Sequence, residues 1–159
     1  MSDFLRFPHT PHIAWLSKGK PRDDKVFAAR EVDAFLRGVV VLEEKVDGAN
    51  LGISVGPDGL LRAQNRGQYL LRPYKAQFSR LNAWLAGQES MLLATLGGNL
   101  ILFGEWLAAT HSIPYDRLPD FFLVFDVYDR SAGGFWSTTQ RNALAERLGL
   151  RVIRSLGAG

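Results

Sequence analysis

The chain has 159 residues, 47% of them hydrophobic, which suffices for the core of one domain, and it contains no internal repeat or low-complexity tract. It has no cysteine, which excludes thiol catalysis, zinc-thiolate sites and disulfides. Its net charge of +3 is spread along the chain and is compatible with nucleic acid as a partner. Because membrane-length apolar runs and a signal-peptide pattern are absent from the sequence, we expect a cytoplasmic protein with no membrane partner.

The first half of the chain predicts one helix and three strands. Residues 1–24 are irregular, and residues 25–37 predict a short helix that ends at Gly38. The apolar side chains expected to be buried by this helix are Val26, Phe27, Val32, Phe35 and Leu36. Strand patterns follow at 39–45, 50–56 and 60–66, and a Pro-Asp-Gly turn between the last two predicts a hairpin.

The second half alternates helices with strands. Apolar residues recur every three or four positions from Tyr74 to Leu85, and a further helical piece is expected near 88–96. The remaining expected elements are apolar strands at 97–107 and 120–129, a capped helix at 137–150 and a strand beginning at Arg151. This order indicates a single α+β domain over residues 1–159, with mainly antiparallel sheets and flanking helices.

A cluster of charged residues stands at the end of the strand predicted at 39–45. Lys45 follows two glutamates, and a buried lysine is costly unless it is paired or used for chemistry. The chain then turns through Asp47 and Gly48, which presents the ammonium group at the mouth of a sheet and allows a ligand or backbone to approach closely. Lys-x-Asp-Gly alone is a weak signal, and a salt-bridged surface lysine is its structural alternative.

Four segments together are more specific. EKVDGAN (44–50) resembles the nucleotidyl-lysine motif of the covalent nucleotidyltransferases, the superfamily of ATP-dependent DNA ligases, RNA ligases and mRNA capping enzymes. It is most similar to the RNA ligases that seal nicks in duplex RNA, the RNA ligase two-like family. QNRGQ (64–68), LFGEW (102–106) and FFLVFDVYD (121–129) resemble that family's arginine-bearing, Gly-Glu and aromatic-Asp motifs, in the same order. The resemblance implies the ATP-grasp-like nucleotidyltransferase fold of a ligase adenylation domain.

The resemblance also implies roles for individual residues. Lys45, in its neutral form, would attack the α-phosphate of ATP, giving lysyl-AMP and pyrophosphate. The residues implied to bind or surround the nucleotide are Glu44 through its backbone at the adenine edge, Asp47 and Gly48 in the turn, Asn50 near the phosphate and the RNA end, Arg66 at a phosphate, Glu105 at the ribose hydroxyls and Phe125 by stacking on adenine.

Two of these assignments have structural alternatives, and no metal site is predicted. Arg66 could be an ordinary surface arginine, and Phe125 a core aromatic whose role a register slip of one residue would move to Val124 or Asp126. His9 and His12 have a metal-like spacing but no third ligand. The cofactors that the resemblance implies are ATP with Mg²⁺ or Mn²⁺, and no residue of the chain is assigned as a metal ligand.

The sequence also departs from the family. Its late Glu-Gly motif and its late lysine pair are absent, so the C-terminal part of the adenylation domain is missing. The sequence leaves open whether the chain is the start of a longer enzyme or a shortened descendant. We expect that it cannot seal a nick alone, that Arg141 and Arg147 lie on a solvated helix face, and that residues 151–154 leave a strand edge unpaired.

Two classes of function remain. The first is an ATP-dependent RNA ligase that joins 3'-hydroxyl and 5'-phosphate ends of nicked or broken RNA through lysyl-AMP, with DNA ligase and capping-type nucleotidyltransferase as neighbouring alternatives. The second is a non-catalytic module that binds nucleotide or nucleic acid. RNA against DNA as substrate, the oligomeric state and the biological pathway are not determined by the sequence.

Overall fold

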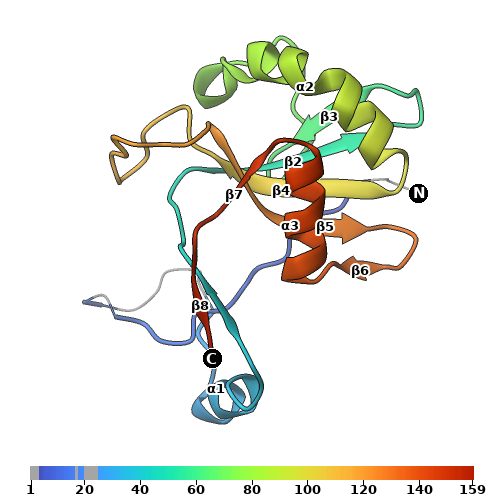
Figure 1. Ribbon diagram of the computed structural model, residues 1–159. Helices are drawn as coiled ribbons and strands as arrows, with labels where there is room; N and C mark the ends of the chain where they lie inside the picture. The colour runs from blue at the N-terminus through green and yellow to red at the C-terminus, as the bar shows by residue number, and fades with distance from the viewer. Residues whose placement is uncertain (1–3, 17, 20–24) are drawn as a thin grey trace.

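A large mixed sheet forms the body of the molecule (Figure 1). The computed structural model describes residues 4–16, 18–19 and 25–159. In the described chain the large sheet has the order β3-β2-β4-β5-β6, and β7 pairs with β5. Its strands are β2 (Ala49–Val55), β3 (Leu61–Gln64), β4 (Leu100–Trp106), β5 (Phe122–Asp129), β6 (Gly134–Phe135) and β7 (Arg151–Val152). All of its strand pairs are antiparallel except β5 with β7, which confirms the expected α+β class.

The predicted hairpin joins β2 to β3. Val55 pairs with Leu61, and the amide N–H of Gly56 donates to the carbonyl of Leu60 at 2.8 Å. Gly59 takes φ +75°, a left-handed conformation that glycine adopts without steric cost, so the Pro-Asp-Gly sequence suits this tight turn.

Helices cover one face of the large sheet and the N-terminal segment covers part of the other. The main core joins side chains of β2, β4 and β5 to α2 (Leu81–Leu96) and α3 (Thr138–Arg147). On the opposite face, Phe7 packs against Ile101 and Phe103. Both layers are apolar, which explains why the central strands read as nearly continuous hydrophobic runs.

Two predicted helical pieces form one helix. The pieces expected to end at Leu85 and to restart near 88 are continuous as α2, which begins only at Leu81. Before it, Tyr74 is buried outside any helix, and a single 3-10 turn, η1 (Ala76–Phe78), leads into α2. The apolar spacing nevertheless predicted buried positions correctly, since Phe78, Leu81 and Leu85 are buried.

A second, two-stranded sheet is set apart from the body (Figure 1). It pairs β1 (Val41–Glu43) with β8 (Ser155–Ala158), next to the short helix α1 (Ala29–Phe35). The expectation of a buried helix at 25–37 is wrong in its burial, because no residue of α1 is buried and Phe35 is 51% exposed.

The expectation of an unpaired strand edge at residues 151–154 is also wrong. The amide of Ile153 donates to the carbonyl of Val124, and the carbonyl of Arg154 accepts from the amide of Glu44. This segment therefore runs from the large sheet to the small one and is hydrogen-bonded to both. No helix in the described parts of the chain has the length and apolarity needed to cross a membrane.

Candidate active site

One cavity of about 640 Å³ lies between the end of β1 and the face of β2, β4 and β5. All eight residues singled out from the sequence line it, although they come from four separate motifs: Glu44, Lys45, Asp47, Gly48, Asn50, Arg66, Glu105 and Phe125. The volume lies in the range of pockets that bind small molecules and cofactors. Lys45, Arg66, Glu105 and Phe125, one from each motif, thus line one pocket.

Lys45 reaches this cavity from the segment just beyond β1. The strand ends at Glu43, and the next amide, that of Glu44, donates to the carbonyl of Arg154 at 2.9 Å. The strand predicted at 39–45 therefore stops two residues early, and regular strand alternation has already ended at Lys45. Glu44 and Lys45 both line the cavity, and Lys45 is exposed whereas Val46 is buried.

The Asp47–Gly48 turn is held by hydrogen bonds from the loop after β4. The carboxylate of Asp47 accepts from the amide (2.9 Å) and the hydroxyl of Ser112, and these bonds keep the pKa of Asp47 below its usual value. The amide of Asp47 donates to the hydroxyl of Tyr115 at 2.7 Å. Asp47 is therefore engaged in shaping the turn, in the manner proposed from the sequence.

Gly48 is required by a close approach of backbone. A β-carbon at this position would lie 2.5 Å from the carbonyl oxygen of Trp106 in β4. The amide of Gly48 donates to Oε1 of Glu105 at 2.9 Å, so the turn after Lys45 is fastened directly to the carboxylate on β4.

Glu105 faces the cavity because the register of β2 and β4 places it opposite Asn50. Burial raises the pKa of Glu105, whereas the hydrogen bond from Gly48 and the nearby charges of Lys45 and Arg66 lower it. A half-buried carboxylate next to two cations can accept hydrogen bonds from the hydroxyl groups of a bound sugar.

Asn50 and Arg66 lie at the side of the cavity that continues into a shallower pocket past the loop after β3. Arg66 was expected to be the last residue of the strand, but β3 ends at Gln64. Arg66 lies in the following turn, in which the side chain of Asn65 accepts hydrogen bonds from the amides of Gly67 and Gln68. Oδ1 of Asn50 is buried and has no hydrogen-bond partner among the described residues. A ligand that donates a hydrogen bond would satisfy it.

A β-bulge decides which side chains of β5 face the cavity. Phe103 pairs with Asp126 and Gly104 with Val124, so Phe125 is the extra residue of the bulge. Val124 lies fully buried on the helix-covered face, whereas Phe125 and Asp126 both line the cavity. The ring of Phe125 also contacts Phe7 at 5.1 Å between centroids. In a regular strand, successive side chains face opposite sides, so only one of Phe125 and Asp126 would have faced the cavity.

Several lining residues were missed by the sequence interpretation. Burial raises the pKa of Asp126 to about 6, with the Arg141 charge lowering it and the Glu43 charge raising it. Asp126 and Glu43 adjoin residues that the motifs did identify. Arg141 was expected on a solvated face, and that is wrong, since it is 3% exposed and paired with Glu43. The remaining missed residues are Phe7, Thr10, Val46, Thr138 and Ile153.

The donor set suits a nucleotide better than a metal ion held by protein alone. An aromatic ring, a carboxylate that can bind hydroxyls and two exposed cations surround one space. In the described residues, no three His, Cys, Asp or Glu side chains lie close enough together to hold a metal ion. A divalent cation at this cavity would therefore need ligands from water and phosphate oxygens, as Mg²⁺ commonly has.

Comparison with known proteins identifies a family and a fold. The family model of RNA ligases matches residues 38–159. No curated protein matches the chain. Among solved structures, a mutant Naegleria gruberi RNA ligase with ATP and Mn superposes with a TM-score of 0.66 at 16% identity, over 82% of this chain and 39% of that one.

Two further structures show the same relationship. The Naegleria gruberi RNA ligase with pyrophosphate gives a TM-score of 0.58 at 20% identity, over 76% of this chain and 37% of that one. An archaeal ATP-dependent RNA ligase gives 0.60 at 22% identity, over 82% and 34%. The chain thus spans less than half the length of these proteins, and at such identities the likeness concerns the fold. With its family model covering most of the sequence, the chain belongs to the RNA ligase family.

Proposed function

We propose that this chain performs the adenylation step of an ATP-dependent RNA ligase, with Lys45 as the nucleophile. The observation that carries the proposal is the convergence of an exposed lysine amine, a half-buried carboxylate and an aromatic ring on one cavity of about 640 Å³. Together they supply what a nucleotide needs, namely a base platform, a hydroxyl acceptor and an attacking group around one space.

In the proposed step, the neutral amine of Lys45 attacks the α-phosphorus of ATP. A nitrogen–phosphorus bond forms, the bond to the bridging oxygen breaks, pyrophosphate leaves, and the amine's proton passes to water, which reaches the exposed side chain. Glu105 binds the ribose hydroxyls and Phe125 stacks on the adenine. The AMP group would then pass to a 5'-phosphate of RNA, to be displaced by a 3'-hydroxyl.

The charge of the cavity supports a metal-bound nucleotide as the substrate. Five carboxylates and three cationic side chains line it in the described part of the chain, so the cavity does not favour a bare polyphosphate. The Naegleria structure contains ATP together with Mn. We therefore propose ATP with Mg²⁺ or Mn²⁺ as the form that binds, with the cation carried by phosphate and water.

The test is covalent labelling. Incubation with ATP labelled at the α-phosphate, in Mg²⁺ or Mn²⁺, should leave label on the protein after denaturation, and peptide mass spectrometry should place it on Lys45. Lys45→Ala should reduce labelling to background. Lys45→Arg should do the same, because a guanidinium stays protonated and cannot attack.

Lys18→Ala provides the matched control, because Lys18 is exposed and does not line the cavity. It should label like the unchanged chain. The second lysine of this segment considered from the sequence, Lys20, lies outside the described residues. Label on the Lys45→Arg variant would reject the nucleophile, whereas ATP binding without any label would favour a non-catalytic nucleotide-binding module. Labelled GTP in parallel distinguishes a capping-type reaction.

The choice of RNA is tested by the next step. The pre-formed covalent adduct is mixed with a 5'-phosphorylated RNA strand, or with DNA of the same sequence, each in a nicked duplex, and transfer of AMP to the strand is measured. The proposal expects faster transfer to RNA. Equal or faster transfer to DNA would point to a DNA ligase instead.

A further inference from the structure

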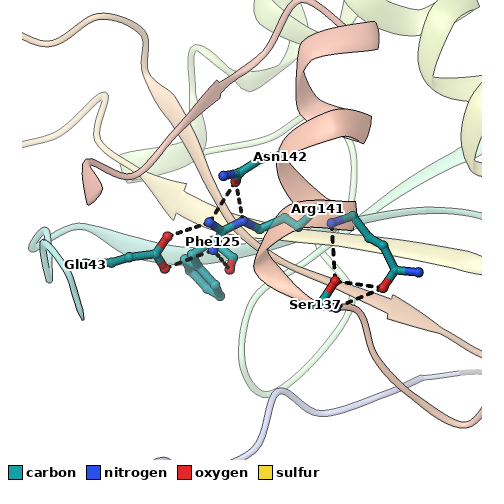
Figure 2. A network of polar contacts seen from close by, with 6 residues as sticks. Glu43, Phe125, Ser137, Arg141 and Asn142 are labelled. Atoms are coloured by element: carbon teal, nitrogen blue, oxygen red, sulfur yellow. Dashed lines mark hydrogen bonds and ion pairs between the residues drawn. The ribbon is translucent and has the colours of Figure 1, made fainter. Parts of the chain in front are cut away.

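Arg141 is the most enclosed charged residue of the cavity, and it comes from a part of the chain that lies outside all four ligase-like motifs. It belongs to α3, whose start is fixed by reciprocal bonds between Ser137 and Gln140. The next residue, Arg141, makes a backbone hydrogen bond to the carbonyl of Ser137 at 2.9 Å. This capped helix start therefore points a particular side chain into the cavity wall (Figure 2).

All five N–H groups of the Arg141 guanidinium have acceptors (Figure 2). Nη1 donates to Oε2 of Glu43 at 2.9 Å and to the carbonyl of Phe125 at 2.7 Å. Nη2 donates to Oε1 of Glu43, and Nε and Nη2 both donate to Oδ1 of Asn142. Because its donors are used and it is only 3% exposed, Arg141 is not placed to bind phosphate itself.

The two main partners of Arg141 belong to different sheets. Glu43 is the last residue of β1 and stands two positions before Lys45. Phe125 is the bulged residue of β5, at a point where that strand is not paired with its outer neighbours. Those pairs lie on either side of it, with β7 at Leu123 and Val124 and with β6 at Tyr128 and Asp129. The guanidinium thus occupies a gap in the hydrogen bonding of β5.

We infer that Arg141 is a positioning residue, which sets the place of Lys45 relative to the ring of Phe125 by binding Glu43 and the main chain of the bulge together. The inference rests on the function proposed above for its catalytic consequence. Lys45 stands two residues beyond β1 of the small sheet, whereas Phe125 lies on β5 of the large one, so the contacts that join the two sheets contribute to setting their separation. A bidentate arginine–carboxylate pair has the rigid geometry that this task requires.

The test compares the rate of covalent adenylation at saturating ATP with the apparent KM for ATP. Arg141→Met keeps an unbranched apolar stem and removes the hydrogen bonds that link Glu43 to the main chain of Phe125. It should slow adenylation by about 10- to 100-fold per folded molecule, with little change in KM, because misplacing a reacting group by a small distance costs rate more than ground-state binding. Arg141→Lys should be intermediate, since it restores the charge without the planar fork.

Loss of fold is separated from loss of positioning by a second variant. Arg141→Met leaves the Glu43 carboxylate without its cation, which can itself destabilise the chain. The double variant Glu43→Gln with Arg141→Met removes that unpaired charge, so it should melt at a higher temperature than Arg141→Met and yet stay slow. Arg147→Met, on the exposed face of the same helix, should label at the unchanged rate.

A second readout does not depend on catalysis. In the nucleotide-free protein, Arg141→Met should shift the backbone amide NMR signals of Lys45 and Phe125 well beyond the shifts caused by Arg147→Met. If the unchanged chain forms no adduct, the proposed function fails. The NMR comparison then tests by itself whether Arg141 positions Lys45 and Phe125. Unshifted signals, or a double variant that adenylates at the unchanged rate per folded molecule, would overturn the inference.

Discussion

The two sheets of this protein differ sharply in how deeply they bury their apolar side chains. In the large sheet, Ile53, Leu102 and Phe122 are 0% exposed. In the small sheet, Leu42 is 54% and Leu156 is 61% exposed. The large sheet therefore carries most of the folding energy that burial supplies, while the small sheet is held mainly by its backbone pairing and its connections to the body.

This difference matters because the cavity draws on both sheets. Glu105 and Phe125 lie on the large sheet, whereas Lys45 follows β1 of the small one. The joint includes the hydrogen bonds from Arg141 to Glu43 and to Phe125, the backbone bond from Glu44 to Arg154, and a small apolar cluster that contains Val46 and Ile153. Together with the bond from Gly48 to Glu105, these contacts hold the segment of Lys45 against the large sheet.

The largest expected effect comes from the core of the large sheet. Phe122→Ala should lower the free energy of unfolding by about 3–5 kcal/mol, because a fully buried ring is replaced by a cavity. Phe35→Ala on α1 should cost less than about 1 kcal/mol, since that ring is half exposed. Urea denaturation measures both. Similar losses at the two positions would show that α1 is packed as tightly as the body.

An intermediate effect is expected from two glycines on either side of the joint. A methyl group at Gly48 would collide with the main chain of Trp106, so Gly48→Ala should destabilise the chain by about 1–3 kcal/mol and impair adenylation. At Gly38, before β1, no atom of the described residues other than its chain neighbours lies within 4 Å of the β-carbon position. Gly38→Ala should therefore change stability by about 0.5 kcal/mol at most. Urea denaturation and covalent labelling of both variants check this contrast. Equal losses of stability in the two variants would contradict it.

The smallest expected effect is a pH dependence of the unfolding free energy that comes from Asp126, the residue next to the bulge. Burial raises the pKa of Asp126 to about 6 in the folded chain, from an ordinary value of 3.8. The folded state then binds this proton more tightly than the unfolded state does, so the contribution to stability is fully present below about pH 4 and is lost as the pH rises through 6.

Because Asp126 is only partly buried, solvent screening reduces this contribution to about 1 kcal/mol. Urea denaturation of the unchanged chain and of Asp126→Asn should therefore give unfolding free energies whose difference shifts by that amount between pH 4 and pH 7, in the direction of a relative loss for the unchanged chain. Parallel pH curves for the two proteins would mean that the carboxyl is solvated like an ordinary surface group.

Local patterns in the sequence identified most elements, and the family resemblance identified half of the residues that line the cavity. The turn between β2 and β3, the Ser137 cap of α3 and the stop at Gly149, with φ +66°, follow from residues whose conformational preferences act over a few positions. The eight motif residues were identified through the resemblance of four short segments to known ligase motifs. Such segments are recognisable because a site that binds one small ligand places its groups at the ends and turns of strands.

Other features depend on contacts between distant residues, which periodicity does not encode. The bulge that turns both Phe125 and Asp126 toward the cavity is a property of the pairing between β4 and β5, since one strand alone does not reveal its register. Glu43 and Arg141 are 98 positions apart, and a helix sequence that looks solvated gives no sign of a buried acceptor. The motif residues were therefore determined locally, whereas the joint that holds them in place exists only once the two sheets meet.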